Sequence, residues 1–296
     1  MDEDEMEKGH EDNWGRWGKE DEKGTLNLQT SASVLAALKL PVHGKVYPLA
    51  MPISSETRVP HIRNAPWRWL SATSDPRHPQ KRGSADEVLV LQYHGASTHI
   101  DGLGHMWYDG RLYNGFPEGT IEPMAGLTRC GIDKAGPIIT RGVLLDVAGW
   151  KGVSRLPNGY AITGGELEAC ANDHGVEVRT GDAVCIRTGW LTDFKVNPET
   201  YPGEPGPGVN ALEWLLRREV ALVGADNVAV EVTPPEDRSQ VLPFHLRWLR
   251  DVGGYLIEWL ELDALAADRV YEFLFVALPL NITGGAGSPI TPVAVA

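Results

Sequence analysis

Short apolar runs alternate along the chain with segments whose apolar residues have helical spacing. Runs of strand length occur at 45–51, 87–93, 143–147, 183–187, 221–223, 228–232, 255–257 and 271–278. Helices are expected from Ser31 or Ser33 to Leu40, through 163–174 behind a Thr163–Glu166 capping box, and at 211–219, 243–251 and 262–267. This alternation predicts an α/β fold, although so many short strands do not match a doubly wound sheet.

Residues 52–86 interrupt the alternation with a long segment rich in Pro, Arg and Ser. A loop of that length in a compact domain is usually functional or disordered. His61, Trp67 and Trp69 favour an ordered lid. The sequence after residue 23 contains neither an internal repeat nor a low-complexity linker, so we expect one domain over residues 13–296.

The charge of the chain is acidic and unevenly distributed. There are 27 Lys and Arg against 40 Asp and Glu, a net charge of −13, which argues against a basic groove for nucleic acid and against attraction to anionic lipid. Residues 1–22 hold ten acids and three bases, a charge of −7. Residues 1–12 are therefore expected to form a solvated, disordered tail.

The remaining composition predicts a cytoplasmic protein. No apolar run reaches the ~18–20 residues that a membrane-spanning helix needs, and the acidic start of the chain lacks the apolar stretch of a signal peptide. The three cysteines, Cys130, Cys170 and Cys185, are too few and too scattered for a disulfide framework or a CxxC zinc site.

Candidate chemistry is concentrated in the segment YHGASTHIDGLGH, which follows an apolar run. His99 and Asp101 are two residues apart, so on an extended chain their side chains share one face. Imidazole and carboxylate are the ligands of catalytic zinc or manganese sites. Two following glycines allow a sharp turn that returns His105 to the same point. His94 falls on the opposite face of a regular strand, so it needs a bulge near 95–97 to join the others.

Two further candidates lie far along the chain. His245 follows a proline at an expected helix start, and Glu258 lies in the apolar segment YLIEWLEL. Burying a carboxylate there is costly without a cation or a donor, whereas an edge strand would leave Glu258 in solvent. Asp226 and Asn227 are expected to form either a plain turn or a pair that holds metal ligands in position.

Aromatic residues could form the walls of a substrate pocket. Trp107 and Tyr108 follow the histidine-rich segment, and Trp67 and Trp69 lie in the long excursion. Such walls suit a flat substrate, while the alternative is that these rings pack in the core or in a lid. The glycines in GPG at 206–208 are expected at the edge of a pocket, since no Lys-Ser/Thr follows for a phosphate-binding loop.

Together these residues resemble the cyclase family of metal-dependent hydrolases, which includes bacterial kynurenine formamidase and isatin hydrolase. The family signature is H-x-G-T-H-x-D-x-P-x-H, and residues 98–101 and His105 match it with the family spacing. Gly95 stands where the family has its first histidine, and Leu103 replaces the proline. The resemblance covers most of residues 13–285 and indicates the longer branch of roughly 300 residues; it includes 13–27, 108–115, 144–152, 181–190, 224–227 and 244–262.

The resemblance assigns roles to individual residues. It implies metal ligands at His94, His99, Asp101 and His245, and proton transfer by His105 and Glu258. The ligand role of His94 depends on an H-G-x-x-T-H spacing in the longer branch. His105 is either a general base or a ligand of a second metal, so the site holds one or two ions, Zn²⁺ or Mn²⁺.

The resemblance also implies a fold and an activity. The fold is the family's swivelling β/β/α arrangement, a mixed sheet around a metal pocket. The activity is hydrolysis of an amide, lactam or lactone bond in a small cyclic or aromatic substrate by a metal-activated water. A homo-oligomer, dimer or tetramer, is expected, with a neighbouring subunit helping to close the site. The alternative is a non-catalytic small-molecule binding protein on the same fold; a serine hydrolase is disfavoured because no G-x-S-x-G is present.

Overall fold

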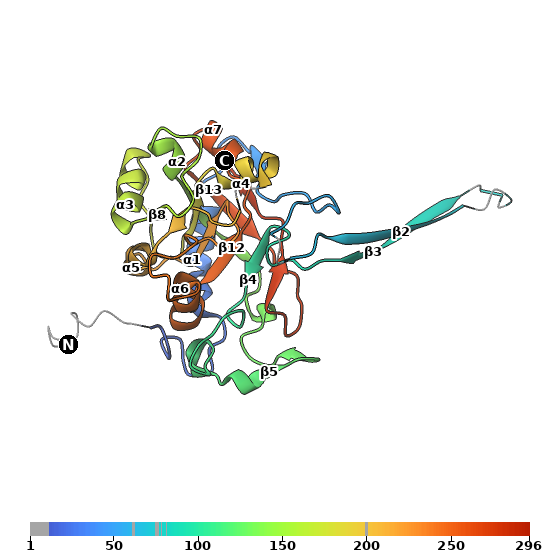
Figure 1. The fold of residues 1–296 in the computed structure, drawn as a ribbon, viewed down its shortest axis with the longest axis horizontal. Coiled ribbons are helices and arrows are strands. Elements are labelled where there is room, and N and C mark those ends of the chain that lie inside the picture. The colour runs from blue at the N-terminus through green and yellow to red at the C-terminus, as the bar shows by residue number, and fades with distance from the viewer. Residues whose placement is uncertain (1–11, 61–62, 75–76, 78, 81, 199–200) are drawn as a thin grey trace.

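A nine-stranded mixed sheet forms the centre of the protein in this computed structural model (Figure 1). The structure describes residues 12–60, 63–74, 77, 79–80, 82–198 and 201–296. Residues 1–11 of the expected tail at 1–12 lie outside these residues, as does His61. The strands lie in the order β1 (Val46–Pro48), β15 (Val293–Val295), β13 (Glu272–Ala277), β7 (Ile138–Asp146), β9 (Ala183–Arg187), β11 (Leu222–Ala225), β12 (Tyr255–Glu258), β4 (His99–Asp101) and β14 (Gly287–Pro289).

Four central strands, β7, β9, β11 and β12, run parallel, and the outer strands pair antiparallel. Almost every residue of the central strands is buried. Parallel strands are covered on both faces and therefore read as continuous apolar runs. This explains why β9, β11 and β12 are found within two residues of the predicted positions, while β7 begins five residues before the predicted start at residue 143.

Two apolar clusters pack against the two faces of the sheet. Val143 and Leu145 of β7 point into one cluster and Leu144 into the other, as alternation along a strand requires. The first cluster contains side chains of helices α3 (Gly164–Asp173) and α5 (Val209–Arg217). The second is completed by the irregular segments that precede β7. The protein is therefore a mixed α/β fold, as predicted.

The remaining helices are short. They are α1 (Ser31–Ala37), α2 (Val147–Trp150), α4 (Trp190–Val196), α6 (Pro243–His245), a π-helical turn over Leu246–Val252 and α7 (Asp263–Ala267). The Thr163–Glu166 capping box begins α3 as predicted. The prediction for α1 is wrong at both ends: Thr30 is the cap, because its side chain accepts from the Ser33 amide, and the helix ends at Ala37. In the described residues no helix combines the length and apolar character needed to cross a bilayer.

The excursion at 52–86 contains most of an antiparallel hairpin that projects from the body of the protein (Figure 1). Strand β2 (Trp67–Ser74) pairs with β3 (Gly83–Val90), and every residue of β3 is exposed. The predicted strand at 87–93 therefore belongs to this arm and not to the main sheet. Its β-branched content suits a pleated strand but does not show where that strand is buried. We call the hairpin of β2 and β3 the arm.

The predicted strand at 228–232 is also wrong. The segment is buried but forms a series of bends, with Val230 at a φ of +53°. Its apolar residues are covered by neighbouring loops instead of being paired in a ladder. The chain is bent at this point beside the end of β11, and a further carboxylate is thereby brought to the site described next.

Candidate metal centre

The candidate residues His99, Asp101 and Glu258 lie on two neighbouring strands. In the antiparallel pairing of β4 with β12, His99 lies directly opposite Glu258. Side chains opposite each other on paired strands lie on the same face, and Asp101 shares that face because it is two residues from His99. All three are buried, with Glu258 6% exposed and the other two fully covered. Glu258 is thus an interior carboxylate, not a group on a solvent-facing edge.

The imidazole of His99 is oriented by the backbone. Its Nδ1 lies 2.8 Å from the carbonyl oxygen of Ser97, and donation to this carbonyl leaves the Nε2 lone pair free. His99 Nε2 lies 3.4 Å from Asp101 Oδ1 and 3.2 Å from Glu258 Oε2. Nε2 therefore faces two carboxylates and can bind either a proton or a metal ion.

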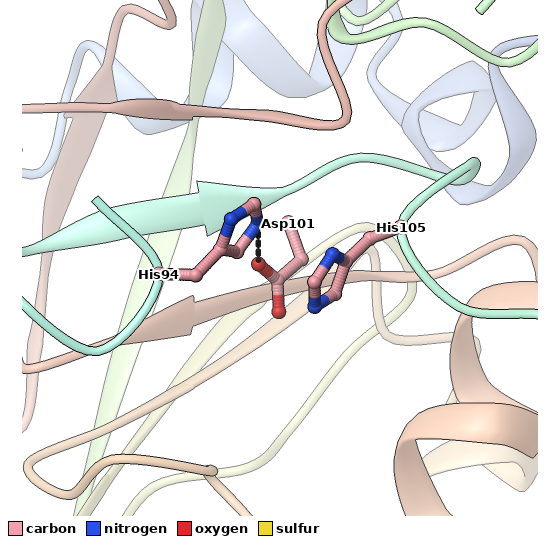
Figure 2. Close-up of side chains that lie close together, drawn as sticks. All are labelled: His94, Asp101 and His105. Atoms are coloured by element: carbon pink, nitrogen blue, oxygen red, sulfur yellow. Dashed lines mark ion pairs between the residues drawn. The ribbon is translucent and has the colours of Figure 1, made fainter. Parts of the chain in front are cut away.

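His94 reaches the same point through a tight turn. Gly95 has a φ of +73°, and the turn that follows reverses the chain, so the face expected on a regular strand no longer applies. His94 Nε2 lies 3.1 Å from Asp101 Oδ1, and Figure 2 shows His94, Asp101 and His105 pointing toward one another. The rings of His94 and His105 are stacked, with centroids 4.0 Å apart.

His105 returns through the predicted glycine turn. Its amide donates to the carbonyl of Gly102 at 3.0 Å. A side chain at Gly104 would overlap Leu127, since a Cβ there would lie 2.5 Å from a Leu127 methyl carbon. Glycine avoids this overlap, which a side chain could relieve only by moving Leu127.

A carboxylate that the sequence analysis did not single out orients His245. Glu231 Oε1 lies 2.7 Å from His245 Nδ1 and accepts the His245 amide at 2.8 Å. His245 Nε2 then lies 3.1 Å from Glu258 Oε1 and 3.6 Å from Asp101 Oδ2. Glu231 falls within the apolar run 228–232, so the cost of burying its carboxylate, the argument applied to Glu258, was the signal that could have found it.

The charges of the cluster favour a bound cation. Burial alone would lower the pKa of His99, but the charges of Glu258 and Asp101 outweigh it and raise that pKa to about 10. Burial lowers the pKa of His105 to about 4, so this imidazole is neutral near pH 7. Burial would raise the pKa of Asp101, yet the surrounding histidines hold it well below its usual range. The carboxylates therefore remain ionised and attract positive charge.

The donor atoms fit a divalent metal ion. Within the described residues, His94 Nε2, His99 Nε2 and both carboxylate oxygens of Asp101 are buried without a hydrogen bond of acceptable geometry, which is rare for buried polar atoms. His94, Asp101 and His105 offer ligand atoms within 4.8 Å of one another, as do His99, Asp101 and Glu258. Nitrogen and oxygen donors of this kind suit Zn²⁺ or Mn²⁺.

A cavity of about 580 Å³ opens beside the cluster. His94, His105, His245 and Glu258 form part of its wall, and the rest is mainly prolines and small aliphatic residues with Tyr201. Tyr201 lies in the YPGEPGPG loop, whose downstream GPG was expected at a pocket edge. The volume is in the range of small-molecule sites.

The four aromatic residues that the sequence suggested as pocket walls lie outside the cavity wall in the single chain. Trp67 and Trp69 lie on β2 of the arm and are each 57% exposed. The indole of Trp107 donates to Glu118 at 2.9 Å, and the Tyr108 hydroxyl donates to Asp251 at 2.7 Å. None of the four lines the cavity, since proximity in sequence to the histidines does not set the direction of the following turn.

Asp226 and Asn227 support the loops around the site. Asp226 accepts from the amides of Thr188 and Gly189, both at 2.7 Å. The Asn227 side-chain amide donates to the carbonyl of Pro205 at 2.7 Å. The backbone carbonyl of Asn227 accepts from the backbone amide of Trp259, next to Glu258, at 3.0 Å. These residues connect neighbouring loops and contribute no atom to the histidine cluster.

Comparison with known proteins identifies relatives over most of the chain. A family model named Cyclase, described as "Putative cyclase", matches residues 47–232. Isatin hydrolase from Roseibium aggregatum is 29% identical over 141 residues, which cover 46% of this chain and 52% of that protein. The match thus spans about half the length of this curated relative.

Solved structures extend the comparison to the whole fold. A crystal structure described as a novel cyclase has a TM-score of 0.89 and 34% identity, covering 96% of this chain and 99% of that chain. Isatin hydrolase A from Ralstonia solanacearum has a TM-score of 0.59 and 22% identity, covering 90% of this chain and 95% of that chain. The second likeness concerns the fold alone.

Proposed function

Because this chain belongs to the cyclase family, we propose that it is a metal-dependent hydrolase. It would open an amide, lactam or lactone bond in a small cyclic or aromatic substrate. The observation that carries this proposal is the set of buried, unpaired ligand atoms of His94, His99 and Asp101 beside a cavity of small-molecule size. The naming of relatives as cyclase and isatin hydrolase supports the same activity.

His94, His99, Asp101 and His245 are the residues that we propose hold the metal. One ion or two ions fit, because the two groups of donors share Asp101. When bound there, Zn²⁺ or Mn²⁺ would lower the pKa of a water molecule toward ~7 and polarise a substrate carbonyl.

His105 and Glu258 are the proposed proton-transfer groups. Both line the cavity, and His105 is neutral near pH 7 because burial lowers its pKa to about 4. A group of this kind accepts a proton from the attacking water and delivers it to the leaving nitrogen or oxygen. His245 Nε2 lies 3.1 Å from Glu258 Oε1, so this nitrogen would either hold the metal or orient the Glu258 carboxylate.

A hydrolysis screen tests the proposed activity and identifies the bond. Formylkynurenine, isatin and several lactones are incubated with the protein, with and without added Zn²⁺ or Mn²⁺. We expect metal-dependent opening of at least one of these bond classes. A protein that binds metal and a small molecule from the panel but opens none of them would instead be the non-catalytic binding protein.

Replacing Glu231 with glutamine should lower kcat/KM or metal affinity by about 10- to 100-fold, the usual effect of removing the partner of a ligating histidine. The amide retains the shape of the side chain but cannot provide the charge that holds His245 Nδ1 at 2.7 Å. The matched control is Glu213→Gln, which changes an exposed carboxylate paired with Arg247. Equal kinetics and metal content in both variants would show that Glu231 does not support the site.

We also propose that the protein is a homo-oligomer in which the arm packs on a second copy of the chain. Trp67 faces Val90 and Trp69 faces Val88 across the arm, and all four are roughly half exposed. A two-stranded hairpin is marginal in water on its own, and an apolar patch of this kind typically marks an interface. In a single chain Trp67 and Trp69 do not line the cavity. In the proposed oligomer they would lie against a second copy of the chain.

Light scattering after gel filtration should therefore give the mass of a dimer or tetramer. The double variant Trp67→Ser/Trp69→Ser is expected to shift the protein to a smaller species, because it removes most of the apolar area on that face. Leu35→Ser, an exposed apolar residue of α1, serves as the control and should leave the mass unchanged. A monomeric wild-type protein would contradict the proposal.

A further inference from the structure

Two arginines, Arg63 and Arg238, line the cavity beside the candidate metal centre. In the described part of the chain, no hydrogen bond or ion pair connects either guanidinium group to another residue. Other arginines of this protein are paired: Arg141 contacts Asp182 at 2.6 Å and Arg187 contacts Asp146 at 2.8 Å. The cavity wall therefore contains two cationic groups whose donors are available to a ligand.

Arg63 is held close to the histidine cluster. Its side chain packs on Gly95, where a Cβ would lie 3.2 Å from Arg63 Cγ, and Gly95 directly follows His94. The half-buried stem of Arg63 is thereby fixed against the turn that positions His94. The guanidinium group lies on the same cavity wall as the imidazole.

Arg238 lies at the exposed side of the cavity. The adjacent carboxylate of Asp237 forms no ion pair with Arg238 in the described structure; it accepts hydrogen bonds from the Ser239 amide and hydroxyl at 3.0 and 2.7 Å and from Gln240 at 2.8 Å. The two arginines thus add positive charge to the cavity wall of a protein whose net charge is −13.

Two acidic residues also line the wall, and neither forms an ion pair with Arg63 or Arg238 in the described structure. Glu258 faces His99 and His245 within the cluster. Glu204 is 1% exposed, and burial raises its pKa to about 8. Glu204 accepts from the Val228 amide at 2.6 Å and pairs with no cation among the described residues. Outside the metal cluster, the cavity wall therefore presents two arginines and one buried carboxylate that is not paired with them.

We propose that the substrate of this site carries a carboxylate, which Arg63 and Arg238 bind at a distance from the bond that is cut. This inference rests on the proposed hydrolase function and narrows its substrate class to anionic amides, lactams or lactones. A guanidinium group presents planar paired donors that match a carboxylate. The cavity of about 580 Å³ has room for a ring between the two ends.

A matched pair of substrates tests the inference. Formanilide and 4-formamidobenzoate differ only in the carboxylate, as do a neutral lactone and its ring-carboxylated analogue if the protein opens lactones. The wild-type protein should prefer the anionic member through a lower KM. Arg63→Gln and Arg238→Gln should each raise KM for the anionic member about tenfold, the loss of a charged hydrogen bond, with kcat and the neutral member little changed.

Two controls separate binding by arginine from other effects. Arg63→Lys retains the charge and should recover part of the preference, and Arg247→Gln changes an arginine that pairs with Glu213 away from the cavity. An unchanged preference in both glutamine variants, or equal losses for the neutral and anionic substrates, would overturn the inference.

Binding of benzoate keeps this test distinct from a test of the hydrolase function. Calorimetry with benzoate and with neutral benzamide is performed on chelator-treated and zinc-loaded protein. We expect benzoate to bind more tightly in both preparations and to lose about tenfold in each arginine variant. If no substrate is hydrolysed but this pattern holds, the function fails and the anion site remains. If benzoate binding is insensitive to the arginines, the anion site fails whatever the activity.

Discussion

Asp101→Asn is expected to lose bound metal and to reduce kcat/KM by more than about 100-fold. Asp101 is shared by both groups of candidate ligands, and neither of its buried oxygens has a hydrogen-bond partner in the described structure. An amide retains the shape but supplies no negative charge and turns an NH₂ group toward the histidines. Because loss of a ligand's partner already costs about 10- to 100-fold, loss of the shared ligand should cost more.

Metal analysis and steady-state kinetics on the purified variant measure both effects. Asp268→Asn is the matched control, since that carboxylate is exposed and contacts Lys45 and Tyr47 far from the cluster. Circular dichroism should show that both variants are folded. Wild-type metal content and turnover in Asp101→Asn would exclude the proposed ligand assignment.

Arg141→Ala is expected to lower the free energy of unfolding by about 3 kcal/mol or more, the usual cost of leaving one partner of a buried ion pair alone. Arg141 contacts both carboxylate oxygens of Asp182, at 3.0 and 2.6 Å, and donates to the Glu177 carbonyl at 2.6 Å. Asp182 is 3% exposed. Its carboxylate would remain buried with only the backbone amide of Arg179 as a strong donor.

Urea denaturation compares this variant with Arg247→Ala, which breaks a largely exposed ion pair and should cost less than about 1 kcal/mol. The double variant Arg141→Met/Asp182→Leu should recover much of the loss, because it removes both buried charges. A loss in Arg141→Ala no larger than that in Arg247→Ala would show that the pair contributes little to the fold.

The central sheet could be predicted from the sequence because its strands are buried on both faces. The apolar runs in β9 (183–187) and β13 (272–277) indicate that burial. The cap of α3 is equally local, since the capping box uses residues three apart. The arm could not be placed, because only the apolar run that begins at Glu87 indicated a strand, and that run resembles a buried strand although it is exposed in the structure. The resemblance to the cyclase family is confirmed.

The candidate site could be predicted only in part. His99 and Asp101 follow from a two-residue spacing on a strand, and the structure brings them together as expected. His94 depends on the reversal of the chain at Gly95, which its spacing does not specify. Glu231 enters through a bend where a strand was expected. The arginines of the cavity wall come from segments far apart in the sequence, so only the tertiary structure shows them together.

The central claim is that the histidine cluster binds a divalent metal on which hydrolysis depends. Its most direct test is a titration of metal-free protein with Zn²⁺ or Mn²⁺, followed by calorimetry and by hydrolysis of the best substrate of the screen. The account predicts saturation at one or two ions per chain and turnover that appears in step with binding. Full turnover in the chelated protein, or the absence of stoichiometric metal binding, would contradict it.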